Sequence, residues 1–218
     1  MEKYHTTLAA RLEVAQSQGQ QGIPVDDLKP LVKELLLLLS EFHDKNHAHL
    51  DIKPWNILVA PNGRLALCDV SSSHFHDPKN NITKHIPKRG SLGFLAIEIL
   101  ERRPVADARP ADMYSLGATI AWLRGVQISP APLDADEIIG DIDLAFHPET
   151  YSFANDFLRK LLLLPNEERP SANEALADPW LVGCDVEPRD ISWLKYVVPS
   201  RDRVTFPHPG PIKPWPHT

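Results

Sequence analysis

The 218-residue sequence has few cysteines, no long apolar run and no excess of positive charge. Its two cysteines, Cys68 and Cys184, provide no disulfide framework and are typical of a reducing compartment. No apolar run approaches the ~20 residues of a membrane span, and Met1–Tyr4 lacks a signal-peptide pattern. A formal net charge of −6 argues against nucleic acid or an anionic membrane as a main partner. These absences predict a protein of the cytoplasm or the nucleus.

The residues that are present predict a mostly helical domain. Hydrophobic residues make up 43% of the chain, which is enough to build a sizeable core. Pro30 is a favoured first-turn residue, and Ser171 is a favoured N-cap. The spacing of apolar residues predicts four helices, over residues 31–46, 112–123, 153–164 and 171–178.

A short β-hairpin is predicted near the middle of the sequence. The apolar runs Ile57–Val59 and Leu65–Leu67 flank a turn that contains Asn62-Gly63, a strong hairpin signal. From Pro199 onward, closely spaced prolines deny the chain regular hydrogen bonding. The sequence therefore predicts a domain over residues 1–183 and an extended, proline-rich tail over residues 184–218.

Polar residues stand at fixed offsets around this hairpin. Residues 49–56 read His-Leu-Asp-Ile-Lys-Pro-Trp-Asn, and Asp69 follows Asn56 by thirteen positions. A hairpin between Asn56 and Asp69 would bring their side chains to one cleft. The competing interpretation is a buried hairpin with incidental polar residues.

This pattern resembles the catalytic and metal-binding loops of eukaryotic-type protein kinases. The resemblance implies that Asp51 orients a substrate hydroxyl and accepts its proton, while Lys53 neutralises charge on the transferring phosphate. It implies that the Asn56 amide oxygen and the Asp69 carboxylate hold Mg²⁺ together with ATP oxygens and water. ATP and Mg²⁺ are thus the expected cofactors.

The resemblance also predicts the rest of the nucleotide site and the substrate. Glu2, in a segment similar to the hinge between kinase lobes, and Leu58, in the hairpin, are expected to contact the nucleotide beside Lys53, Asn56 and Asp69. In this family, a lysine two residues after the catalytic aspartate implies a protein Ser/Thr or dual-specificity kinase.

Further matches follow in the family's order. Residues 90–98 are similar to the end of an activation segment, with Glu98 kept. Asp112 starts a segment similar to the family's central helix, in which this aspartate binds the catalytic-loop backbone. Arg169 is the implied partner of Glu98, and Ser91 is implied to bind Asp51.

Two departures from the family pattern concern the same loops. Leu50 replaces an arginine that usually pairs with a phosphorylated activation segment, so activation by that route is not expected. Val70-Ser71 replaces Phe-Gly after the metal-binding aspartate, and serine restricts the backbone freedom that glycine provides.

The N-terminal β lobe of a kinase, with its glycine-rich loop and third-strand lysine, has no match in the sequence. The expected fold is thus the mainly α C-terminal lobe of the α+β kinase fold, in which the small hairpin carries both loops. Three explanations are open: a truncated product of a full kinase, a pseudokinase that acts as an interaction module, or a chain completed by a partner that covers the open face.

Two smaller features allow alternative interpretations. His43, His47 and His49 invite comparison with a zinc site, although the resemblance explains His49 as a residue that braces the catalytic loop. Cys68, beside Asp69, is either an alkylatable thiol in the nucleotide pocket or an inert small hydrophobe.

Overall fold

A computed structural model describes residues 6–77, 84–127 and 135–184 of the chain. Glu2 and residues 185–218 of the predicted tail lie outside the described residues. The described helices are α1 (Leu8–Ser17), α2 (Val25–Asp44), α3 (Ile97–Leu100), α4 (Arg109–Leu123), α5 (Ala135–Ala145), α6 (Ser152–Leu162) and α7 (Ala172–Leu176).

In the described part of the chain, the strands are short and pair antiparallel in three small sheets, ordered β1-β3-β4, β2-β5 and β6-β7. The strands are β1 (Thr6–Thr7), β2 (His47–Ala48), β3 (Ile57–Val59), β4 (Leu65–Leu67), β5 (His74–Phe75), β6 (Lys84–His85) and β7 (Pro104–Val105). The structure is thus helix-rich, as the sequence predicts.

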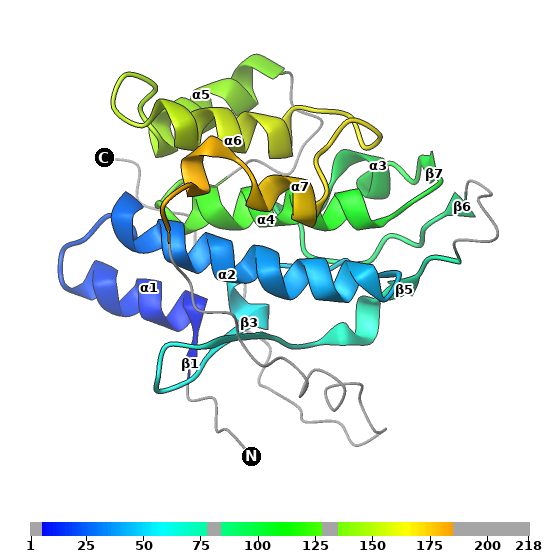
Figure 1. Cartoon of the computed structure of the whole chain (residues 1–218), viewed down its shortest axis with the longest axis horizontal. Helices are drawn as coiled ribbons and strands as arrows, with labels where there is room; N and C mark the ends of the chain where they lie inside the picture. The colour runs from blue at the N-terminus through cyan, green and yellow to red at the C-terminus, as the bar shows by residue number, and fades with distance from the viewer. Residues whose placement is uncertain (1–5, 78–83, 128–134, 185–218) are drawn as a thin grey trace.

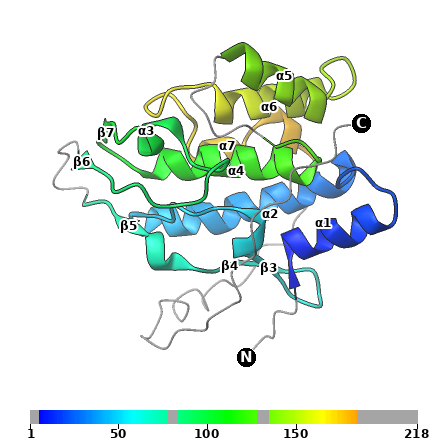
Figure 2. The ribbon, with the colours of Figure 1, turned by 180° about the vertical axis from the view of Figure 1, so that it is seen from behind.

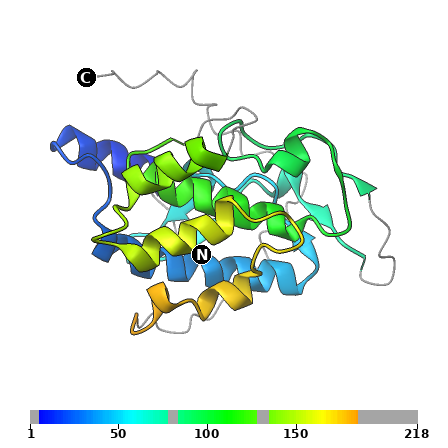
Figure 3. The same cartoon turned by 90° about the horizontal axis from the view of Figure 1, so that it is seen from above.

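Helices α2 and α4 form the centre of the molecule. In Figure 1, α2 crosses the middle of the view, with α5 and α6 above it and α1 and β3 below it. The view from behind shows α4 running alongside α2, between α2 and helices α5 and α6 (Figure 2). From above, α6 lies over α4, and α7 lies along α2, in agreement with the packing contacts between these pairs (Figure 3). The layers leave the β3–β4 hairpin at the edge opposite α5 and α6.

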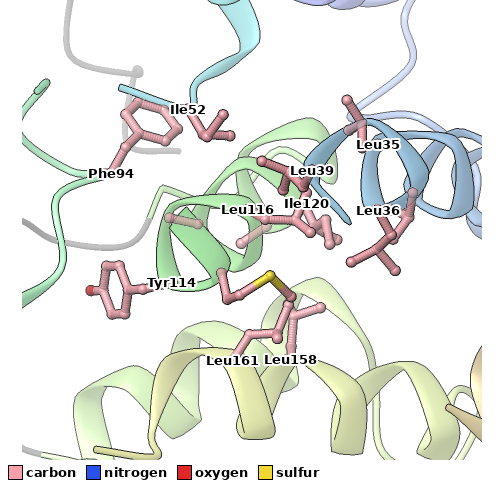
Figure 4. Packing of buried hydrophobic residues seen from close by; sticks show 14 of the residues in the cluster. Leu35, Leu36, Leu39, Ile52, Phe94, Tyr114, Leu116, Ile120, Leu158 and Leu161 are labelled. Atoms are coloured by element: carbon pink, nitrogen blue, oxygen red, sulfur yellow. The ribbon is translucent and has the colours of Figure 1, made fainter. Parts of the chain in front are cut away.

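Helix α4 is buried on every side. All residues from Ala111 to Leu123 are buried, and a helix that is enclosed all round belongs inside a core. Gly117 allows α6 to approach closely, because a Cβ at this position would lie 3.0 Å from the side chains of Leu161 and Leu162. Figure 4 shows the core between α2, α4 and α6, with Leu39 of α2 beside Ile120 of α4.

The predicted helices are found, but the first begins earlier than predicted. Helix α2 starts at Val25 and contains Pro30, although proline removes a backbone donor inside a helix. Buried Val25 and Leu28 extend the apolar face toward the N-terminus. Acidic residues in the first turn also favour this start through the helix dipole. Helices α1, α3 and α5 were not predicted.

A buried ion pair joins α3 to the segment before α7. Arg169 Nη1 lies 2.7 Å from Glu98 Oε1, and their side chains are 2% and 6% exposed. Asn166 also donates to Glu98 Oε1, while Arg169 donates to the Pro110 and Leu164 carbonyls. The predicted pairing of Glu98 with Arg169 is therefore confirmed.

The guanidinium of Arg169 also lies over the ring of Tyr114, 5.4 Å from its centroid. Such a contact between a cation and an aromatic face is attractive. Tyr114 thus provides an aromatic surface for this arginine.

We expect Arg169→Ala to destabilise the protein by ~3–5 kcal/mol, because it leaves the Glu98 carboxylate buried without its partner. Arg103→Ala is the matched control, since Arg103 pairs with Glu101 at the surface, with a side chain that is 59% exposed. Exposed pairs contribute ~0–1 kcal/mol. Urea unfolding of both variants measures the difference, and equal losses would contradict a structural role for the buried pair.

The same pair predicts a pH dependence of stability. Burial raises the pKa of Glu98, but Arg169 and Asn166 outweigh it and leave this pKa below its ordinary value of 4.5. A carboxyl group with a lowered folded pKa contributes full stability above its unfolded pKa and loses that contribution as the pH falls through the folded pKa. The stability difference between wild type and Glu98→Gln should therefore be constant above pH 4.5 and shrink below it.

Urea unfolding of wild type and Glu98→Gln over an acid pH series tests this prediction. Glu101→Gln, which changes the exposed carboxylate of the other Arg–Glu pair, is the control. A Glu98→Gln difference that is constant throughout the acid range would contradict the assignment.

Candidate functional site

The β3–β4 hairpin brings two sequence motifs together. Strand β3 pairs with β4 from Ile57 opposite Leu67 to Val59 opposite Leu65. At the open end, the backbone N–H of Cys68 donates to the carbonyl of Asn56 over 3.0 Å. Asp69, the next residue, therefore lies beside the loop that ends at Asn56.

Asp51 is the centre of a hydrogen-bonded cluster at this end of the hairpin. Its Oδ2 accepts from Lys53 Nζ at 2.9 Å and from Asn56 Nδ2 at 2.8 Å, and its Oδ1 accepts from Ser91 Oγ at 3.0 Å. Lys53 Nζ also donates to Ser91 Oγ over 2.7 Å. The predicted contact of Ser91 with Asp51 is confirmed, and the cluster holds the carboxylate in one orientation.

Gly90 explains how Ser91 reaches this cluster. Its φ is +110°, and an added Cβ would lie 2.6 Å from the Leu50 carbonyl oxygen. Glycine adopts this backbone conformation without steric cost and permits the close approach of the two loops.

Asp112 fixes the loop that carries Asp51. This carboxylate is fully buried at the start of α4 and accepts hydrogen bonds from the backbone N–H groups of His49 and Leu50, both over 2.7 Å. The His43 ring lies 2.9 Å from the same carboxylate. The predicted contact between Asp112 and the loop backbone is confirmed, whereas the sequence did not indicate the third partner, His43.

Leu50 fills the position where the family commonly has arginine. It is buried, and its φ of +63° lies in the left-handed region that disfavours residues other than glycine. The hydrogen bond from its N–H to Asp112 helps to hold this strained backbone. The apolar side chain is part of the core, so it presents no charge to the activation segment.

His49 is fully buried, and Cys68 is partly buried. Burial lowers the pKa of His49, whose Nε2 lies 3.1 Å from the Cys68 carbonyl oxygen. Burial, together with the negative charge of Asp69, raises the pKa of the Cys68 thiol to about 11. A protonated thiol is a poor nucleophile, which favours an inert Cys68.

Asp69 is exposed and adopts a left-handed conformation, with φ 60° and ψ 61°. Its Oδ1 accepts a hydrogen bond from Ser71 Oγ over 2.6 Å. Val70–Ser72 forms a 3₁₀ turn, and Ser71 has no positive φ, so serine fits where the family has glycine. The expectation that serine restricts this loop therefore gains no support from the backbone, because the turn does not use glycine's extra freedom.

The side-chain oxygens of Asn56 and Asp69 are suitable ligands for a hard cation such as Mg²⁺. Asn56 donates from its amide nitrogen to O and Oδ2 of Asp51, so its amide oxygen is the atom available to a ligand. Carboxylate and amide oxygens are ligands that Mg²⁺ prefers. Within the described ranges, no group of three or more His, Cys, Asp or Glu side chains could hold a metal. An ion at Asn56 and Asp69 would need further oxygens from a nucleotide or water.

The structure thus brings Asp51, Lys53 and Asn56 into direct contact and places Asp69 beside them. Leu58 lies half-buried in β3, between its partners Thr7 and Ala66. Glu2 is outside the described residues. Among the described helices, none is long and apolar enough to cross a bilayer.

A loop that carries Asp51 is held by buried Asp112 and is followed by a hairpin and by Asp69, as in the loops of protein kinases that the sequence resembles. The family model for the protein kinase domain matches residues 2–181. The chain belongs to the protein kinase domain family.

Curated relatives carry the same family name. The chain is 33% identical over 158 residues to mitogen-activated protein kinase kinase kinase 3 of Arabidopsis thaliana. This match covers 69% of this chain and 27% of the relative. It is 31% identical over 193 residues to serine/threonine-protein kinase D3 of Mus musculus, and the match covers 83% of this chain and 20% of the relative. It is 28% identical over 184 residues to death-associated protein kinase 2 of Mus musculus, and the match covers 77% of this chain and 47% of the relative. The chain thus spans less than half the length of each of these relatives.

We expect Asp112→Asn to destabilise the protein by ~1–3 kcal/mol, because an amide group offers one acceptor oxygen to two buried backbone donors. Thermal unfolding measures the loss, and hydrogen exchange at the amides of His49 and Leu50 locates it. Asp156→Asn, an exposed change on α6, is the control. Unchanged protection of both loop amides would contradict the role of Asp112.

Proposed function

We propose that this chain carries the catalytic centre of an ATP-dependent protein Ser/Thr kinase. The observation that carries the proposal is the cluster in which Lys53, Asn56 and Ser91 all bind the Asp51 carboxylate. Lys53, two residues after Asp51, supports the Ser/Thr class through the family resemblance. Relatives named as serine/threonine kinases support the same class.

In the proposed reaction, the Asp51 carboxylate orients a substrate hydroxyl and accepts its proton. The hydroxyl oxygen bonds to the γ-phosphorus of ATP while the bond from phosphorus to the β–γ bridging oxygen breaks. Lys53 balances negative charge on the transferring group, and Ser91 holds both side chains through its hydroxyl. The products are a phosphorylated protein and ADP.

Asn56 and Asp69 are the residues that would hold Mg²⁺, through the amide oxygen and the carboxylate. When bound, Mg²⁺ neutralises charge on the ATP phosphates. The backbone hydrogen bond from Cys68 to Asn56 keeps these two residues adjacent before any ligand binds.

We also propose that a second wall completes the nucleotide site, either an N-terminal lobe or a partner chain. In this proposal, Leu58 of β3 and the two loops would line one side of the nucleotide. Phosphate binding in the family also uses a glycine-rich loop and a third-strand lysine, which the sequence does not match. A nucleotide on this chain alone would be held from one side, so its affinity should be weak.

Calorimetry of ATP binding to the 218-residue chain in Mg²⁺ tests the proposed metal site. We expect weak binding that Asp69→Asn abolishes, because the exchange removes the charged ligand. A peptide phosphorylation assay should then show activity that Asp51→Asn abolishes while leaving ATP binding largely unchanged. Asp156→Asn is the surface control.

Two results would overturn the enzyme assignment. ATP binding that is unaffected by Asp69→Asn would exclude the proposed metal site. Phosphotransfer that persists in Asp51→Asn would exclude Asp51 as the base. If the chain binds no ATP, even when supplied with a complementary lobe, the alternative function as a pseudokinase-type interaction module is favoured.

A further inference from the structure

Ser71 contacts the proposed metal ligand directly. Its hydroxyl donates to Oδ1 of Asp69 across 2.6 Å, within the range for a charge-assisted hydrogen bond to a carboxylate. Asp69 is exposed and occupies a strained left-handed conformation, so this hydrogen bond fixes a side chain that solvent would otherwise leave mobile. No resemblance to the family predicts this contact, because the family has glycine at this position.

The local backbone makes the contact possible. Val70–Ser72 forms a 3₁₀ turn directly after Asp69, and the N–H of Ser73 donates to the Val70 carbonyl over 3.0 Å. This turn carries the Ser71 hydroxyl back to the carboxylate two residues earlier. Glycine at position 71 would fit the same backbone but would supply no hydroxyl.

We propose that Ser71 is a positioning residue for the Asp69 carboxylate, which it holds through Oδ1 and leaves with Oδ2 as the oxygen that would bind a metal. This inference rests on the proposed function of the site. Hydrogen bonds to a ligating carboxylate orient it, and their loss typically weakens metal affinity by ~10–100-fold. The Ser71 hydroxyl thus fixes the orientation of the Asp69 carboxylate, which glycine at position 71 could not do.

The arrangement also has a consequence for metal choice. A carboxylate with one oxygen engaged by a hydroxyl binds a metal through its other oxygen. Mg²⁺ accepts a single carboxylate oxygen in its octahedral shell, whereas the larger shell of Ca²⁺ can also take both oxygens of one carboxylate. Ser71 should therefore favour Mg²⁺ over Ca²⁺ at this site.

The test uses Mn²⁺, which prefers the same oxygen ligands as Mg²⁺, as a paramagnetic probe on the 218-residue chain. Broadening of the amide signals of residues 69–73 during Mn²⁺ titration reports binding without activity or nucleotide. Displacement of Mn²⁺ by Mg²⁺ and by Ca²⁺ then gives the preference between the two metals. The titration is repeated with ATP.

We expect Ser71→Ala and Ser71→Gly to weaken Mn²⁺ binding by ~10–100-fold and to reduce the preference for Mg²⁺ over Ca²⁺. Ser71→Thr retains the hydroxyl and should restore both properties. Ser72→Ala removes a hydroxyl from the same turn without removing the donor to Asp69, so it is the matched control. A general structural role would change the melting temperature but not the Mg²⁺ to Ca²⁺ preference.

Equal or tighter Mn²⁺ binding in Ser71→Ala would overturn the proposal. The hydroxyl would then either have no effect on metal binding or compete with the metal for the Asp69 carboxylate. Absence of broadening in the wild type would overturn it as well. The proposed function fails separately: metal binding that depends on Ser71, without any phosphotransfer even when a complementary lobe is supplied, refutes the kinase activity alone. Phosphotransfer that depends on Asp51, with Ser71→Ala binding metal normally, refutes the role of Ser71 alone.

Discussion

The contact between the Asp112 carboxylate and two backbone amides is the constraint on which the candidate site depends. Asp112 belongs to α4, which is enclosed on every side, and its oxygens receive the N–H groups of His49 and Leu50. Because α4 is packed into the core on every side, the loop that carries Asp51 is tied to a fully buried helix. The hydrogen bonds around Asp51 then act on a loop whose backbone is already fixed.

Much of this arrangement could be predicted from the sequence, because it is encoded in local patterns. The Asn62-Gly63 turn between two apolar runs indicated the hairpin, and the structure pairs those runs at residues 57–59 and 65–67. Motif spacing identified Asp51, Lys53 and Asn56, and the structure joins them by hydrogen bonds. The roles of these residues in metal binding and catalysis are proposals that the biochemical experiments must decide.

Other features depend on tertiary contacts that no local pattern records. Pro30 looked like a helix start, yet α2 continues through it because buried residues on its N-terminal side extend the apolar face. His43 gave no sign of its contact with Asp112, since the partners are 69 residues apart. Ser71 looked like a loss of backbone freedom, whereas its hydroxyl binds Asp69. In each case the surroundings of the side chain, more than its intrinsic preference, determine what it does.

The ion pair between Glu98 and Arg169 has a consequence for how the chain is made. The two residues are 71 positions apart, and Arg169 also binds the carbonyls of Pro110 and Leu164. During synthesis from the N-terminus, α3 and α4 leave the ribosome well before their cationic partner exists. The region around Glu98 therefore cannot complete its polar contacts until Arg169 has emerged, so the last part of the domain to be translated closes the core that the earlier helices begin.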